Sequence, residues 1–183
     1  MHAKNAERLT RDHAELGDLL NQLFAALDSN DVSRSYATLD LFWARLAIHI
    51  RAEHLHLFPA ISRAVSRNLT AHGEDVPPPG DEQKTIAELR DDHEFFMREL
   101  SDAIAIMREL LVNPEADVVA QLQGVRERID GVQRRLVKHN EVEEEGVYLW
   151  TRNLLSEAEQ AELAMLVNKE LENTPPRFNL KAD

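Results

Sequence analysis

The chain has 183 residues and a mass of 20.9 kDa, which suits one domain with a short extension. Lys and Arg total 21 against 33 Asp and Glu, and the formal net charge of −12 argues against nucleic acid and anionic membrane surfaces as partners. The chain contains no cysteine, which excludes disulfides and thiolate metal sites, so any metal must be held by nitrogen and oxygen. Without a long apolar run or a signal-like segment, the sequence predicts a soluble cytoplasmic protein.

An apolar period of 3.6 residues predicts two helical hairpins and one further helix. The first hairpin spans residues 6–67, with a polar turn at 28–31 and a second helix that Pro59 kinks or ends. A linker containing Val-Pro-Pro-Pro-Gly follows at 68–81, and the second hairpin spans 82–150, its last helix beginning between Pro114 and Val118. A capping box at Ser156 opens a fifth helix over 156–172, and residues 174–183 are predicted as an irregular tail.

The two hairpins repeat each other's polar motifs. An Asp-His pair in the first helix returns in the third, and a His-xxx-Glu motif in the second helix returns in the fourth. These motifs are Asp12-His13 and Asp92-His93, and His49-xxx-Glu53 and His139-xxx-Glu143. Two related hairpins with inward apolar stripes predict an all-α fold. We expect an up-down-up-down four-helix bundle with an additional C-terminal helix, forming a single domain over residues 1–173.

Six ionisable residues lie on the inward stripes, where Leu, Ile or Phe is the usual occupant: His13, His49, Glu53, His93, His139 and Glu143. A buried carboxylate without a partner costs several kcal/mol, and no Lys or Arg lies on these stripes to neutralise the glutamates. Because residues four apart lie one turn above each other, each His-xxx-Glu pair offers a nitrogen and an oxygen to one centre. Counting residues from the turns places all six at one height in the bundle.

Four neutral imidazoles and two carboxylates suit two divalent ions with bridging carboxylates, and leave an exchangeable position for water or a small ligand. A structural zinc ion takes four ligands and no open position, so six donors also favour two metals. The metal-free alternative is that the glutamates reach solvent at a bundle end or pair with the nearby histidines. Because the pattern occurs twice, in register, on all four helices, we favour the dinuclear metal centre.

This ordered set resembles the hemerythrin-like, or HHE cation-binding, family over about Thr10 to Leu155. The resemblance extends to Leu57-Phe58-Pro59 and to Leu155-Ser156-Glu157. It implies a four-helix bundle around a non-heme di-iron centre with terminal histidines and bridging carboxylates. The six residues named above would then hold two iron ions, although nitrogen and oxygen donors alone also admit manganese or zinc.

The third helix departs from the oxygen-carrying members of that family. Those proteins place a second histidine four residues from the first, whereas the neighbours of His93 at that spacing are Leu89 and Met97. One metal is then a ligand short. An open position favours reaction of dioxygen, peroxide or nitric oxide over reversible carriage.

Two further residues are candidates for the centre. His56 follows Glu53 by three residues on the inward stripe and is interpreted as an additional ligand or as a group behind one. Tyr148 could donate a hydrogen bond toward the centre or shuttle an electron, with core packing as its alternative. His54 stands where the family commonly has a second glutamate, which the second repeat keeps as Glu144, and both are expected outside the ligand set.

The leading functional prediction is a di-iron protein that binds or reacts with a diatomic ligand or peroxide, as a monomer or homodimer. The alternative is an iron- or oxygen-responsive sensor or iron-binding protein without turnover. A third class is a metal-free, acidic helical interaction module, whose stability would not respond to metal.

Overall fold

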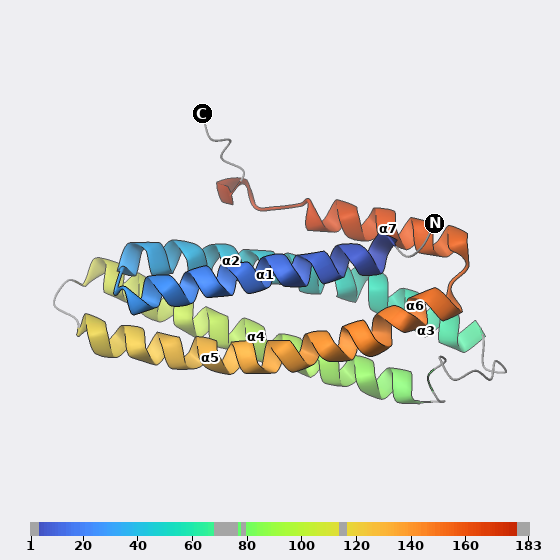
Figure 1. Cartoon of the computed structure of the whole chain (residues 1–183), viewed down its shortest axis with the longest axis horizontal. Coiled ribbons are helices and arrows are strands. Elements are labelled where there is room, and N and C mark those ends of the chain that lie inside the picture. Colours follow the sequence, from blue (N-terminus) through green and yellow to red (C-terminus); the bar gives the residue numbers. More distant parts are fainter. Residues whose placement is uncertain (1–3, 68–76, 78–79, 114–116, 179–183) are drawn as a thin grey trace.

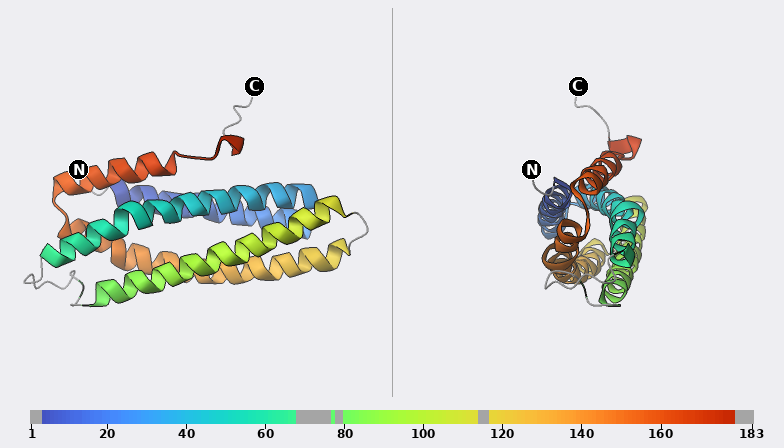
Figure 2. Two further views of the ribbon diagram at one scale, coloured as in Figure 1. Left: turned by 180° about the vertical axis from the view of Figure 1, so that it is seen from behind. Right: turned by 90° about the vertical axis from the view of Figure 1, so that its right-hand side faces the viewer.

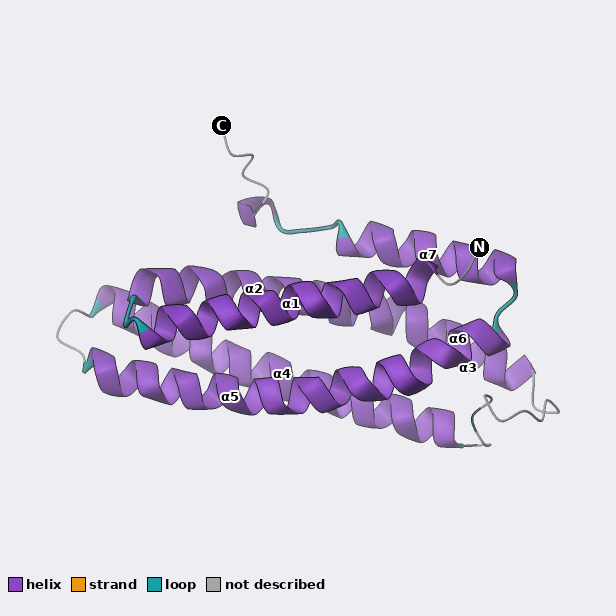
Figure 3. Cartoon of the chain, in the orientation of Figure 1, coloured by secondary structure: helices purple, strands orange, loops and turns teal. Residues whose placement is uncertain are grey.

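The computed structural model describes residues 4–67, 77, 80–113 and 117–178. Within them the chain is helical, and the predicted all-α class is confirmed (Figure 3). The elements follow in the order α1 (Lys4–Asp28), α2 (Val32–Ala52), the π-helical turn η1 (Glu53–Leu57), α3 (Phe58–Arg67), α4 (Asp81–Val112), α5 (Val118–Val142), the π-helical turn η2 (Glu143–Val147), α6 (Tyr148–Leu154), α7 (Glu157–Leu171) and the 3₁₀ turn η3 (Pro176–Phe178).

Two antiparallel hairpins, α1–α2 and α4–α5, lie side by side and form the four-helix bundle (Figure 1). The segment η1–α3 continues α2, and η2–α6 continues α5, so that both rods run on past their π-helical turns. Helix α7 turns back along the outside of α1 and α2, as both views of Figure 2 show. The predicted up-down bundle with an additional C-terminal helix is therefore confirmed.

Capping residues set where the helices begin. Asp31 accepts a hydrogen bond from the backbone N–H of Arg34 at 3.0 Å, and Asp117 accepts one from Ala120 at 3.1 Å. Ser156 forms the predicted capping box at the start of α7. Each of these side chains satisfies a backbone donor that the first turn of a helix leaves free.

The predicted linker and tail are only partly within the described residues. Residues 68–76 and 78–79 of the linker lie outside them, and Asp81 already belongs to α4. In the tail, Pro176–Phe178 forms a single 3₁₀ turn, and residues 179–183 lie outside the described residues. The Arg177 guanidinium in that turn donates to both carboxylate oxygens of Asp40 on α2, at 3.1 and 3.0 Å. No described helix has the length and apolar character that crossing a bilayer requires.

The helix containing Pro59 does not end there. A π-helical turn precedes the proline, in which the N–H of Phe58 donates to the carbonyl of Glu53, five residues back, and the helix continues to Arg67. The second repeat makes the same turn, with Tyr148 donating to the carbonyl of Glu143. Leu149 stands there in place of the proline, so proline is not required for this turn. Both π-helical turns begin at the glutamate of a His-xxx-Glu motif, and such turns are frequent at functional sites.

A polar layer divides the apolar core into two clusters. One cluster fills the bundle toward the α1–α2 and α4–α5 turns and includes Leu23, Phe42, Met107 and Ile129. The other lies toward α3, α6 and α7 and includes Phe58, Ile61, Val147 and Val167. The polar residues of the layer between them are themselves buried, so they need partners within the protein.

Candidate metal centre

The four long helices and the two π-helical turns bring the six predicted ligand residues together in this polar layer. Two groups of donor atoms result, each with all its atoms within 4.8 Å of one another. The first group is His13, His49, Glu53 and Glu143, and the second group is Glu53, His93, His139 and Glu143. Both glutamates belong to both groups, as bridging carboxylates require.

The first group uses one oxygen of each glutamate. Nε2 of His49 lies 3.1 Å from Oε1 of Glu53, and Nε2 of His13 lies 3.3 Å from Oε2 of Glu143. The two imidazoles face each other, with their Nε2 atoms 3.1 Å apart. Two nitrogens and two oxygens thus converge on one small volume.

The second group uses the other oxygen of each glutamate. Nε2 of His93 lies 3.3 Å from Oε2 of Glu53, and Nε2 of His139 lies 3.3 Å from Oε1 of Glu143. The Nε2 atoms of the two imidazoles are 3.0 Å apart. The internal repeat therefore appears in space as two equivalent donor groups joined by two carboxylates.

These donors fit cations. Both carboxylate oxygens of Glu53 and Oε1 of Glu143 are buried and accept no hydrogen bond among the described residues. The Nδ1 atoms of His49 and His139 bond to carboxylates elsewhere, so their Nε2 atoms present lone pairs to the opposing imidazoles. Lone pairs at this distance repel unless a proton, as in the metal-free chain, or a metal ion lies between them. The donor set of imidazole and carboxylate suits iron, manganese or zinc.

Each hairpin supports one candidate ligand histidine with an Asp-Arg pair. Asp12 accepts a hydrogen bond from Nδ1 of His49 at 2.9 Å and binds Arg45 at 2.5 Å. In the second hairpin, Asp92 accepts from Nδ1 of His139 at 3.1 Å and from Arg135. Such carboxylates fix the tautomer of a ligand histidine and raise its basicity.

The role of these aspartates escaped the sequence interpretation. The repeated Asp-His pairs were the available signal, but each aspartate supports a histidine of the neighbouring helix and not the one beside it in sequence. Periodicity along one helix cannot show a partner on another.

The other two candidate ligand histidines differ in their supporting residue. Nδ1 of His13 donates to Oε1 of Glu144 at 2.8 Å, whereas Nδ1 of His93 lies 2.9 Å from Nε2 of His54. Burial, followed by the charges of His93 and Arg90, lowers the pKa of His54, which keeps this imidazole neutral. His54 and Glu144 thus contact ligand residues directly, at equivalent positions of the two repeats.

The buried charges stabilise one another. Burial lowers the pKa of His49, but the carboxylates of Glu53 and Asp12 outweigh it and hold that pKa well above its usual value. Burial raises the pKa of Glu53, but His49 and His93 reverse the shift and hold it well below. Burial and the charge of Glu53 raise the pKa of Glu143, yet His139 and His13 bring it below its usual value. Both glutamates therefore stay ionised and offer negative charge to a cation.

Tyr148 lies at the edge of the first group. Its hydroxyl is 3.3 Å from Oε2 of Glu143, to which it donates, and 3.3 Å from Nε2 of His13. Burial, followed by the charges of Glu143 and Glu53, raises the pKa of Tyr148 well above its usual value, so the phenol keeps its proton. In the second group the equivalent ring is Phe58, 6.1 Å from that of His93.

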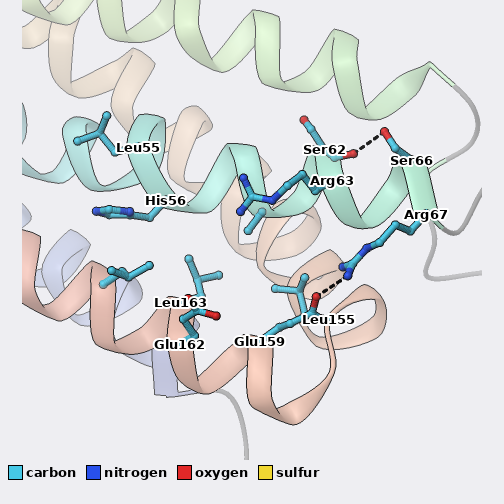
Figure 4. A pocket seen from close by; sticks show the side chains of 12 residues that line it. Leu55, His56, Ser62, Arg63, Ser66, Arg67, Leu155, Glu159, Glu162 and Leu163 are labelled. Atoms are coloured by element: carbon cyan, nitrogen blue, oxygen red, sulfur yellow. Dashed lines mark hydrogen bonds and ion pairs between the residues drawn. The ribbon is translucent and has the colours of Figure 1, made fainter.

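His56 lies away from both donor groups. It lines a groove of about 640 Å³ between η1, α3 and α7 (Figure 4). Its Nε2 atom lies 3.9 Å from Oε2 of Glu170 on α7. Leu55, Arg63 and Leu163 line the same groove. Among the described residues, His56 belongs to neither group of converging donors.

Comparison with known proteins agrees with this geometry. The family model of the hemerythrin HHE cation-binding domain matches residues 4–151, most of the chain, which confirms the resemblance seen in the sequence. The curated proteins and the solved structures contain no match to the chain.

Proposed function

The chain belongs to the hemerythrin HHE cation-binding family, and from this premise we propose that it is a non-heme di-iron protein that binds or reacts with a small oxidant. The oxidant would be dioxygen, peroxide or nitric oxide. The observation that carries the proposal is the division of the oxygens of Glu53 and Glu143 between two groups of histidines. A site for one ion would not need each glutamate to face in two directions.

Each ion would receive four donors from the protein. His13 and His49 would hold one ion and His93 and His139 the other, each with one oxygen from each glutamate. Two histidines with carboxylates and open positions are typical of non-heme iron that reacts with oxygen. When bound, iron supplies the redox chemistry by cycling between the ferrous and ferric states.

Aromatic side chains keep water from the layer of donors. The ring of Phe58 stacks 6.1 Å from that of His93, and the ring of Phe96 meets that of His139 edge-on at 5.4 Å. Phe58 and Phe96 are fully buried. An apolar sheath strengthens the electrostatic interactions inside it and slows the loss of reactive species to solvent.

Tyr148 holds a proton within the layer. Its Oη atom donates to Oε2 of Glu143 and lies 3.3 Å from Nε2 of His13. A phenol that keeps its proton can also orient a polar ligand beside the first group. We assign it this orienting role and not that of a base.

Elemental analysis and the visible spectrum of protein purified anaerobically with iron test the proposal. We expect two irons per chain and a ferric charge-transfer absorption that appears on exposure to air. Less than one iron per folded chain would refute the dinuclear centre. Two irons with a spectrum that neither peroxide nor nitric oxide alters would refute the reactivity and leave an iron-binding protein without turnover.

A further inference from the structure

The two donor groups are equivalent in their ligands but not in what surrounds them. Three pairs of residues related by the repeat differ in character: Glu144 and His54, Glu15 and Phe95, and Tyr148 and Phe58. Glu144 and Tyr148 contact residues of the first group, and Glu15 contacts Arg45, which binds Asp12 behind that group. The two pairs that contain a glutamate therefore place more negative charge behind the first group, whereas the third places a neutral hydroxyl there.

Anionic groups surround the first donor group. His13 donates from Nδ1 to Glu144 at 2.8 Å, and His49 donates from Nδ1 to Asp12 at 2.9 Å. Arg45, which binds Asp12, also donates to Glu15 at 2.8 Å. Both histidines are thus backed by a carboxylate, and the arginine behind one of them is itself neutralised.

Among the described residues, one carboxylate supports the second donor group. His139 donates from Nδ1 to Asp92 at 3.1 Å, but the partner of His93 is His54. Arg135, behind Asp92, lies over the ring of Phe95 at 4.5 Å, where Arg45 has Glu15 in the first repeat. Less negative charge therefore lies behind this group.

The hydrogen bond between His93 and His54 determines the role of His54. For His93 to bind a metal through Nε2, its proton must lie on Nδ1, from which it donates to Nε2 of His54. His54 then acts as a neutral acceptor, in the position where Glu144 offers the first repeat a full negative charge. A neutral acceptor raises the basicity of a ligand imidazole less than a carboxylate does.

We propose that the two metal positions are unequal, and that His54 is the positioning residue which makes the His93–His139 position the weaker and more readily exchanged of the two. This inference rests on the proposed dinuclear centre. Tyr148 does not cancel the difference, because its hydroxyl is neutral. Residues that support a ligand typically change metal affinity 10- to 100-fold, so we expect an effect of about tenfold.

Stepwise titration with zinc tests the inference without any redox reaction. The metal-free full-length chain is titrated in competition with a chromophoric chelator, which yields two binding constants. Unequal constants alone are not diagnostic, since two neighbouring cations also repel each other. The pattern across variants identifies the cause.

Placing a carboxylate at position 54 should strengthen only one of the two metal-binding steps. Glu at position 54 can reach Nδ1 of His93, because Glu144 makes the equivalent contact with His13. We expect His54→Glu to tighten the weaker step about tenfold and leave the tighter step within about threefold. His54→Gln, which is neutral, should change neither step, and Glu144→Gln should weaken the tighter step about tenfold. Glu145→Gln, on the exposed face of the same π-helical turn as Glu144, is the matched control that moves neither step.

Each outcome has one meaning when circular dichroism shows that the variants are folded. Two bound zinc ions whose constants do not respond to His54→Glu overturn the inference and leave the dinuclear centre standing. Tightening of the stronger step by His54→Glu also overturns it, because the order of the positions is then reversed. Fewer than one zinc per chain overturns the dinuclear centre and the inference with it. If His54→Glu does not fold, Glu144→Gln decides: a weakened tighter step supports the inference, and an unchanged one refutes it.

Discussion

Replacing Glu53 by Gln converts the carboxylate that both donor groups share into a neutral amide, because Oε1 faces His49 and Oε2 faces His93. Replacing His13 by Ala removes a donor from the first group alone. The geometry therefore predicts that one substitution affects both ions and the other affects one. If Glu53 and His13 each bound a single ion, each of the two substitutions would remove one ion.

The size of the effect follows from mass action. With free metal held at about 100 times the mean dissociation constant of the two positions, binding stabilises the fold by about 2.7 kcal/mol per ion on average, or about 5 kcal/mol for two. If Glu53→Gln weakens each position about 100-fold, each contributes only about 0.4 kcal/mol. For a chain of this size, 1 kcal/mol corresponds to about 2–4 °C in Tm, so metal should raise the wild-type Tm by about 10–20 °C and the Glu53→Gln Tm by about 2–3 °C.

Thermal melts with and without buffered metal, together with elemental analysis, measure this directly. His13→Ala should keep one ion and about half of the wild-type increase in Tm. Glu141→Gln is the matched control, since this glutamate lies on the exposed face of α5, and its melts should match the wild type. The reasoning is refuted if Glu53→Gln retains one full ion per chain, or if His13→Ala loses both.

Three further outcomes follow from the structure. In the metal-free protein, the folded-state pKa of His49 lies above its unfolded value, so the charged imidazole stabilises the fold fully below about pH 6.5. This stabilisation is lost as the pH rises through the folded-state pKa, and urea unfolding should therefore show lower stability at about pH 9 than at about pH 6. The opposite trend would contradict the charged His49–Glu53 pair. Tyr148→Phe should keep two metals per chain but alter the visible spectrum, because the ring remains and only the hydroxyl beside Glu143 and His13 is lost. Loss of an ion in this variant would mean that the hydroxyl is itself a metal ligand. Arg177→Ala should cost about 1–3 kcal/mol, because it leaves the buried carboxylate of Asp40 without the guanidinium that both of its oxygens bind. It should also speed proteolysis of the C-terminal segment, and an unchanged digestion rate would show that this bond does not hold the segment.

The sequence was sufficient to place the six ligand candidates on one layer. Their inward position follows from the helical period, and their common height follows from counting residues between the turns, as with His13 and His49 on either side of the first turn. The repeat doubled this signal, because chance rarely places two His-xxx-Glu motifs in register. Caps such as Ser156 were equally visible, because they act on backbone within three residues.

A regular helical period does not hold beyond each glutamate. The π-helical turns at Glu53 and Glu143 insert one extra residue per turn, so every later side chain is rotated relative to a straight α-helix. This rotation accompanies the contact of the Tyr148 hydroxyl with Glu143, five residues earlier, which an α-helix would turn well away. The same rotation accompanies the outward direction of His56, whose side chain lies toward α7, whereas a regular α-helical stripe predicts that His56 faces inward.

The sequence by itself determined the all-α bundle, its repeat and the identity of the inward polar residues, because these depend on period and spacing along one chain. Tertiary structure alone decided which oxygen of Glu53 faces which histidine, and that Asp12, Asp92, Glu144 and His54 stand behind the ligands. These contacts join different helices. The rotation of one helix against another depends on the packing of all four, which no spacing within a single helix encodes.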